Sequence, residues 1–127
     1  NRLSAAALER EKATQERVKR EEEKMAQQIA LEIKEGTRQV DTDFKRMSAT
    51  RQALNLAKKQ HTTGEERFRL GLLASHDLIE FQNEVARAEG NALRAVTDYN
   101  KSLVNLYGVA GILLTEYQID VVLPAEE

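Results

Sequence analysis

The sequence is poor in the residues that build compact cores and in those that interrupt helices. Its 127 residues include no Cys, no Trp, one Pro, three Phe and three Tyr. The absence of Cys excludes disulfides, thiol catalysis and thiolate zinc sites. The longest apolar run covers residues 109–114, whereas a membrane-spanning helix needs roughly 18 to 20 apolar residues. We therefore expect neither a compact globule nor a segment that crosses a bilayer as a helix.

Charge and motifs exclude several functional classes. The 19 basic and 21 acidic residues nearly cancel, so the excess positive charge typical of nucleic-acid or anionic-membrane binding is missing. No phosphate-binding loop, nucleophile elbow or zinc-protease motif occurs. Asp41 and Asp43 fall on different helix faces, and His61 and His76 have no metal-ligand spacing. The sequence predicts no enzyme, no cofactor, no metal and no nucleic-acid partner.

What the chain has in quantity is Ala, Leu, Glu, Lys, Arg and Gln, which suits an elongated coiled coil. No Pro occurs between Leu3 and Leu70, which predicts one helix of about 100 Å over 3–70. Its first third is nearly all charged and is expected to lack an intrachain partner. Further on, apolar or small residues recur by threes and fours, at Ile33, Gly36, Val40, Phe44, Met47, Thr50, Leu54, Ala57, His61, Gly64 and Phe68.

The stretch RFRLGLLASHDLIEFQ, residues 67–82, predicts a turn over 70–75. Arg67 and Arg69 suit the negative end of a helix dipole, and Gly71 suits a left-handed C′ position. Ser75 offers an N-cap for a second helix over 76–107, about half as long as the first. Its expected seam steps alternately by four and three, through Leu78, Gln82, Val85, Glu89, Ala92, Val96, Tyr99, Leu103 and Leu106.

The short loop predicts antiparallel neighbours, so the fold class is an all-α hairpin or coiled coil forming a single segment over 1–127. Residues 108–127 are expected to form a short irregular C-terminal strap. The sequence also predicts a rod that self-associates through an outer alanine stripe. The members of this alanine stripe are Ala49, Ala53, Ala88 and Ala95.

An ordered set of residues over the second helix resembles the C-terminal part of the TolC-like outer membrane efflux proteins. The matching frame is an aromatic residue, a Gly three residues later, then Asp, a hydrophobic residue, Gln, an Ala-rich helix, Tyr, Leu and a closing Gly. It is carried by Phe68, Gly71, Asp77, Leu78, Gln82, Ala86, Tyr99, Leu103 and Gly108. The resemblance implies the periplasmic helical hairpin of the second repeat of a homotrimeric export channel.

The resemblance also implies partners and site residues. The turn would dock a periplasmic adaptor protein, which links the channel to an inner-membrane transporter, through Leu70, Gly71, Leu72, Ala74 and Ser75. Asp77 and Glu80 would form an acidic ring at the channel entrance, although acids in a first helical turn also simply favour the dipole. The chain has Phe68 and Leu73 where relatives can carry Tyr and Arg, so a gate built on those polar links is not expected.

A second interpretation of the same sequence is a free-standing coiled-coil scaffold. In this interpretation the leucine-rich turn, Leu70 to Leu73, would bind some other protein, because exposed apolar patches mark interaction sites. A signal peptide, a preceding repeat and amphipathic strands in the coding sequence upstream would favour the channel.

Overall fold

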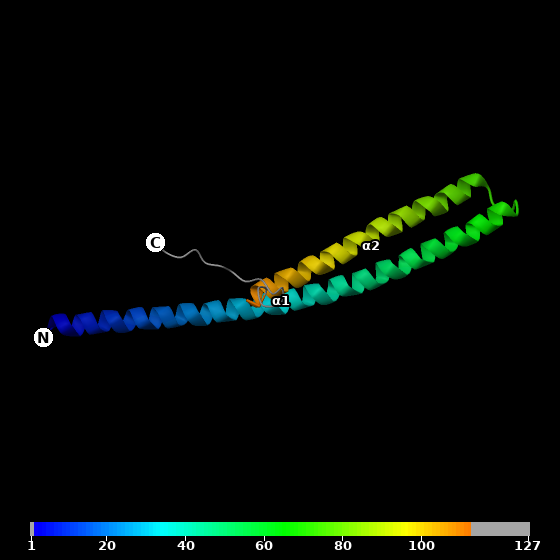
Figure 1. Ribbon diagram of the computed structural model, residues 1–127. Helices are drawn as coiled ribbons and strands as arrows, with labels where there is room; N and C mark the ends of the chain where they lie inside the picture. The colour runs from blue at the N-terminus through cyan, green and yellow to red at the C-terminus, as the bar shows by residue number, and fades with distance from the viewer. Residues whose placement is uncertain (1, 113–127) are drawn as a thin grey trace, which may run out of the picture.

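The computed structural model describes residues 2–112, with side chains from residue 5 onward. It contains two helices, α1 (Arg2–Arg69, 68 residues) and α2 (Ser75–Val109, 35 residues), joined by a turn over 70–74. The helices run antiparallel as a long hairpin, with the N-terminus and the turn at opposite ends (Figure 1). The predicted all-α helical hairpin is confirmed. The predicted strap lies mostly at residues 113–127, outside the described residues.

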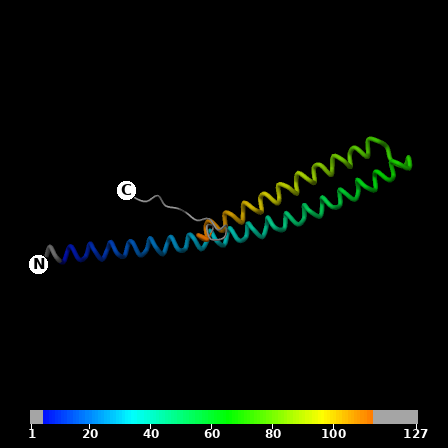
Figure 2. The backbone as a smooth tube through the Cα atoms, viewed as in Figure 1, coloured from blue at the N-terminus to red at the C-terminus, as the bar shows by residue number. Residues whose placement is uncertain are grey.

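Among residues 2–112, only the C-terminal part of α1 packs against another helix. Figure 2 shows α2 running alongside that part, while the remainder of α1 extends alone. All side chains of residues 5–32 are exposed. The ion pairs here are Arg17–Glu21 at 3.8 Å and Arg20–Glu16 at 3.3 Å, and exposed pairs of this kind contribute only about 0.3–0.5 kcal/mol each. The N-terminal part of α1 is thus held by helix propensity and weak local pairs.

Two series of residues spaced by seven form the centre of the interface between the helices. Ser102 lies beside Asp43, and the Phe81 ring lies against Gly64. Equal steps of seven between these two points place Thr50 opposite Ala95 and Ala57 opposite Ala88. We call these positions the small-residue series after most of their members, with Asp43 and Phe81 as the exceptions. They are Gly36, Asp43, Thr50, Ala57 and Gly64 on α1 and Phe81, Ala88, Ala95 and Ser102 on α2.

The burial pattern shows that these two series make the closest approach. Ala95, Ala57 and Ala88 are the buried apolar residues of the described chain, with 2%, 5% and 7% of their surface exposed. The larger residues that flank these two series in the interface, such as Met47 and Tyr99, are only half-buried. Small side chains let two helices come close together, so the hairpin is held by near contact of its backbones more than by bulky side chains.

The predicted seam was partly wrong on both helices. On α1, Asp43 is buried instead of Phe44, which is 50% exposed, and Phe68 is 42% exposed. On α2, four of the predicted seam positions lie one residue too late in the sequence. The prediction had Gln82, Glu89, Val96 and Leu103, whereas the structure has Phe81, Ala88, Ala95 and Ser102. Adjacent residues differ by only about 100° around a helix, so the prediction followed the bulkier Val96 and Leu103 onto the flank of the interface.

The predicted outer alanine stripe is also wrong for two of its members. Ala88 and Ala95 are buried between the helices and cannot face a neighbouring molecule. Ala49 and Ala53 are exposed as expected. The apolar side chains that the hairpin does expose are larger ones, including Leu56 on α1 and Leu93 on α2, at 58% and 69% exposed.

Candidate functional site

The turn between the helices ends α1 with a specific hydrogen-bond motif. Leu72 N donates to Arg67 O at 2.8 Å, and Gly71 N donates to Phe68 O at 2.9 Å. Gly71 has φ +71°, in the left-handed region. These two bonds around a left-handed glycine form a Schellman motif, which satisfies carbonyls that the helix end would otherwise leave free. The predicted left-handed conformation of Gly71 is confirmed.

The start of α2 differs from the prediction. Its N-cap residue is Ala74, with φ −75° and ψ 152°, and no side chain caps the helix. Ser75 is instead the first helical residue. Leu78 N donates to Ala74 O at 3.2 Å, and Asp77 is the acidic residue of the first turn. A carboxylate near the positive end of the dipole favours the helix, which reduces the need for a capping hydroxyl.

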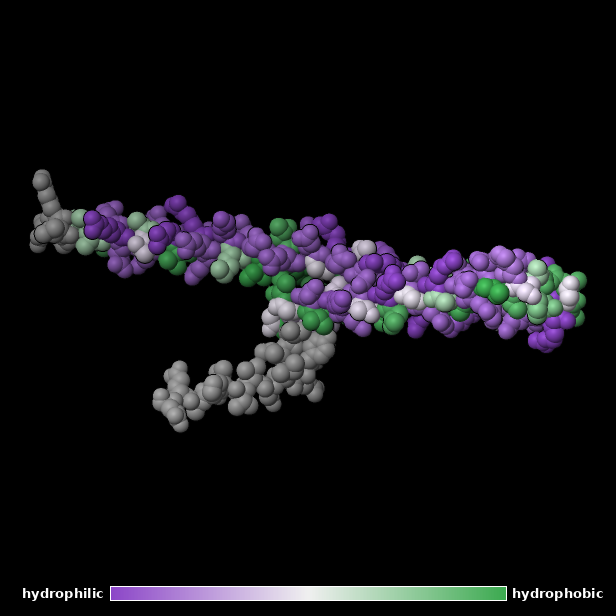
Figure 3. Space-filling view, turned by 90° about the horizontal axis from the view of Figure 1, so that it is seen from above, coloured by the Kyte–Doolittle hydropathy of each residue, from purple (hydrophilic) through white to green (hydrophobic). Residues whose placement is uncertain are grey.

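Of the three leucines in the turn, Leu70, Leu72 and Leu73, only Leu73 packs toward α1. Leu73 is half-buried, and its Cδ2 lies 3.5 Å from the position that a Cβ would take on Gly64. Leu70 and Leu72 are 73% and 66% exposed, and Ile79 on the first turns of α2 is 54% exposed. Figure 3 shows hydrophobic side chains gathered at this end of the molecule. An apolar surface at the end of a charged rod is suited to contact with another protein.

All five predicted tip residues lie together and are exposed. They are Leu70, Gly71, Leu72, Ala74 and Ser75. The two predicted entrance acids, Asp77 and Glu80, are also exposed, a helical turn apart on α2. Within the part of the chain that the structure describes, neither carboxylate takes part in an ion pair. Their charges are thus available to a partner or to solvent.

The two histidines occupy different environments. His61 lies in the seam, with Nδ1 3.9 Å from Glu65 Oε2 and with Nε2 buried without a hydrogen-bond partner. His76 is exposed on the first turn of α2. Among the described residues, no group of three or more His, Cys, Asp or Glu side chains is arranged to hold a metal ion.

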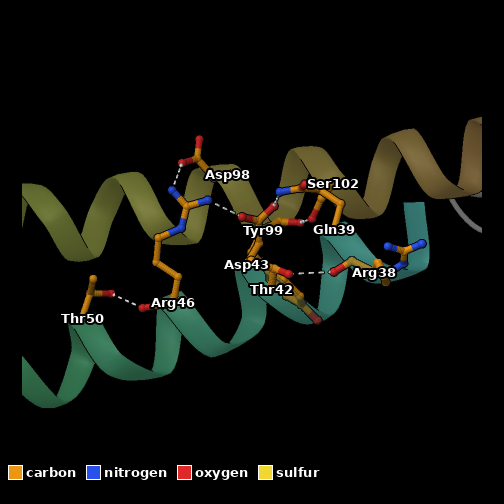
Figure 4. Close-up of polar contacts among 9 residues, drawn as sticks. All are labelled: Arg38, Gln39, Thr42, Asp43, Arg46, Thr50, Asp98, Tyr99 and Ser102. Carbon is orange, nitrogen blue, oxygen red and sulfur yellow. Dashed lines mark hydrogen bonds and ion pairs between the residues drawn. The ribbon is translucent and has the colours of Figure 1, made fainter. Parts of the chain in front are cut away.

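The sequence analysis did not predict a second site, a polar cluster around the buried Asp43 and Ser102 near the far end of α2. We define the polar cluster as Gln39, Asp43 and Arg46 of α1 with Asp98 and Ser102 of α2 (Figure 4). Asp43 is 3% exposed. Its carboxylate accepts hydrogen bonds from Gln39 Nε2, at 3.0 Å, and from the Arg46 guanidinium. The sequence feature that could have indicated this cluster is the spacing of Asp43, one heptad from Gly36 and one from Thr50.

The polar cluster joins the two helices through Arg46. Arg46 Nη1 donates to Asp98 Oδ2 at 3.4 Å, so one guanidinium links a carboxylate on each helix. Ser102 lies beside Asp43 and donates its hydroxyl proton to Tyr99 O at 2.8 Å. Next to it, the Phe44 and Tyr99 rings pack with centroids 5.8 Å apart. The buried carboxylate is therefore enclosed by partners from both helices.

The environment of Asp43 favours its ionised form. Hydrogen bonds from Gln39 and Arg46, together with the Arg46 charge, hold the pKa of Asp43 below its usual value, although burial acts the other way. A carboxyl whose pKa is lower in the folded state stabilises the hairpin above its unfolded-state pKa. That contribution is lost as pH falls through the folded-state pKa.

We therefore expect Asp43→Asn to lower the urea midpoint of unfolding at neutral pH, with the gap to the wild type closing as pH falls below the usual aspartate range. The matched control is Asp41→Asn. Asp41 forms an exposed ion pair with Lys45 at 2.6 Å, and such pairs contribute little. Circular dichroism across a pH series measures both variants. A gap between wild type and Asp43→Asn that stays constant with pH would contradict the assignment.

Comparison with protein families, curated proteins and solved structures finds no match to this chain. Over the described residues, neither helix contains a stretch that is long and apolar enough to span a bilayer. The features that distinguish the molecule are its hairpin shape, its leucine-bearing tip and the polar cluster between its helices.

Proposed function

We propose that this chain is the periplasmic helical hairpin of a TolC-like outer membrane efflux channel. In this role it forms part of the wall of a passive export conduit, as one of three identical chains. Its tip docks a periplasmic adaptor protein, which connects the channel to an inner-membrane transporter. The proposal rests on the sequence resemblance centred on residues 68–108 and is supported by the all-helical hairpin on which those residues lie.

The unequal lengths of the helices suit this role. α1 has 68 residues and α2 has 35, and the part of α1 beyond α2 exposes Leu8, Val18 and Met25 at 55%, 46% and 65%. A long helical segment that packs against nothing in the described part of the chain needs neighbours for stability. Neighbouring segments of a larger channel protein would provide them.

The observation that carries the docking proposal is the exposure of Leu70 and Leu72 at the end of the rod. Turn residues are usually Gly, Pro, Asn, Asp or Ser, since these supply the dihedrals or hydrogen bonds that turns require. Here the backbone Schellman motif around Gly71 supplies both, so the turn does not require the side chains of Leu70 and Leu72. Their side chains are free to bury apolar surface against a partner, at about 25 cal/mol for each Å² removed from water.

The exposed acids add to the proposal. Asp77 and Glu80 stand just beyond the tip on α2, without ion pairs in the described part of the chain. In a three-fold assembly they would bring six carboxylates to one entrance. A ring of carboxylates attracts cations and repels anions.

The proposal predicts that the tip leucines control binding of the adaptor. A photo-cross-linking residue placed at Ala74, in the protein expressed in its native host, is expected to capture a periplasmic adaptor of a tripartite export system. The double change Leu70→Ser and Leu72→Ser is expected to reduce the cross-linked yield about tenfold, because two exposed apolar contacts are removed. Mass spectrometry identifies the captured protein, and gel densitometry measures the yield.

Leu93→Ser is the matched control, since Leu93 is 69% exposed on α2 away from the turn. It is expected to leave the cross-linked yield unchanged. Capture of a protein that is no part of an export system would favour the free-standing scaffold over the channel. An adaptor cross-link that is insensitive to the tip changes would refute docking through the leucines.

A further inference from the structure

We propose that the polar cluster is a register lock, which fixes the axial alignment of α2 on α1. Asp43 is the one ionisable side chain buried in the interface of the described chain. It occupies a position of the small-residue series where the other members on α1 are Gly, Thr or Ala. A buried polar residue in a coiled-coil seam is a well-attested means of setting register.

The rest of the small-residue series distinguishes poorly between alignments. Sliding α2 by one heptad moves it about 10 Å along α1. Sliding toward the tip would bring Ala95 opposite Ala57, and sliding the other way would bring Ala88 opposite Thr50. Both pairings again place a small side chain against a small side chain. The second movement would also bring Phe81 opposite Ala57, where a Cβ takes the space that Gly64 leaves open for the ring, so that slide is opposed at the tip as well.

The polar cluster makes the slid alignments unfavourable. Asp43 would face Val109 after one movement and Ala95 after the other, and neither side chain can form a hydrogen bond to it. Arg46 would also move away from Asp98, which it contacts at 3.4 Å in the observed alignment. In either slid alignment Asp43 keeps its donors Gln39 and Arg46, which lie on α1. It loses the neighbouring Ser102 hydroxyl, and Arg46 loses Asp98, so the native alignment is favoured.

The turn fixes alignment only at the opposite end of the hairpin. Gly71 at φ +71° and the contact between Gly64 and Phe81 hold the tip. Asp43 lies roughly 40 Å along α1 from Gly71 at the rise of an α-helix. An interface of small residues over that length needs a second fixed point, and the polar cluster supplies one near the end of α2.

Engineered disulfides can read the alignment directly, because the chain contains no cysteine. The pair Ala57→Cys and Ala88→Cys reports the native alignment. Two other pairs report the slid alignments, namely Ala57→Cys with Ala95→Cys and Thr50→Cys with Ala88→Cys. In the native alignment the second and third pairs are offset by seven residues, too far for the Cα separation of about 4.4 to 6.8 Å that a disulfide allows.

The test combines each pair with Asp43→Ala, which makes position 43 resemble the other small residues of its series. We expect the intramolecular disulfide yield of at least one slid pair to rise about tenfold, the scale of a lost hydrogen bond to a charged group. Helix content by circular dichroism is expected to stay unchanged. Asp41→Ala, which removes an exposed carboxylate two residues away, is expected to leave all three yields at their wild-type values.

Asp43→Thr provides a second variant, since Thr50 shows that the series accepts threonine. It is expected to raise the slid yields as Asp43→Ala does. If neither variant forms the slid disulfides, the turn and the Gly64–Phe81 contact alone set the alignment, and the register lock is refuted. If both variants lose their helix content, the polar cluster is required for folding and not for alignment, which also refutes it.

Discussion

Replacing Gly64 by leucine is expected to lower the free energy of unfolding of the hairpin by about 1–3 kcal/mol, the usual range for overpacking. A Cβ on Gly64 would stand 2.6 Å from Cδ2 and 3.0 Å from Cε2 of Phe81. The ring would have to leave its half-buried place between the helices. Chemical denaturation followed by circular dichroism measures the change.

Gly90→Leu is the matched control, because a Cβ on Gly90 meets nothing within 4 Å. Removing a glycine from a helix interior generally stabilises it by up to about 1 kcal/mol. The two leucine variants are therefore expected to change stability in opposite directions. Adding Phe81→Ala to Gly64→Leu should recover part of the loss, since the large and small residues are then exchanged across the interface. Equal stabilities for the two leucine variants would contradict the close contact.

Replacing Ala95 by leucine is expected to destabilise the hairpin by a similar amount, about 1–3 kcal/mol. Ala95 is 2% exposed, the least exposed of the buried alanines. Ala95 lies opposite Thr50, and a leucine in its place would force α2 away from α1. The same change at Ala49, an exposed alanine of α1, is expected to stay within about 0.5 kcal/mol of wild type.

Comparing the two leucine variants in urea also tests which alanines face a neighbour. If Ala95 were on the outer face, as the sequence suggested, the two variants would behave alike in the monomer. A larger loss for Ala49→Leu than for Ala95→Leu would contradict the observed burial.

The helices and the turn could be predicted because their signals are local. A proline-free charged stretch, Arg67 and Arg69 at a helix end, and Gly71 just beyond it each favour one structure. The exposure of the tip residues could be predicted for the same reason. Ser75 misled the cap prediction because Ala74 took the N-cap position without a side-chain bond.

The interface itself could not be read in full from the sequence. On α2 two neighbouring frames both repeat every seven residues, and the frame with Val96 and Leu103 carries more apolar surface than the frame with Ala95 and Ser102. Hydrophobic periodicity favours the first, whereas close backbone approach requires the second. The burial of Asp43 was not predicted because a charged residue is normally placed on the surface. Its burial depends on hydrogen bonds from Gln39 and Arg46 of α1 and on its place beside Ser102 of α2.

The free N-terminal part of α1 gives one continuous helix two different stabilities. From residue 33 onward its amide groups are protected by the interface with α2, and breaking them requires separating the hairpin. Residues 5–32, with every side chain exposed, can lose their helical hydrogen bonds without disturbing a tertiary contact of the described residues. The single helix α1 therefore consists of two cooperative units joined end to end. Any neighbour that binds the outer unit also stabilises its helical state, and part of the binding free energy is used to suppress the fraying.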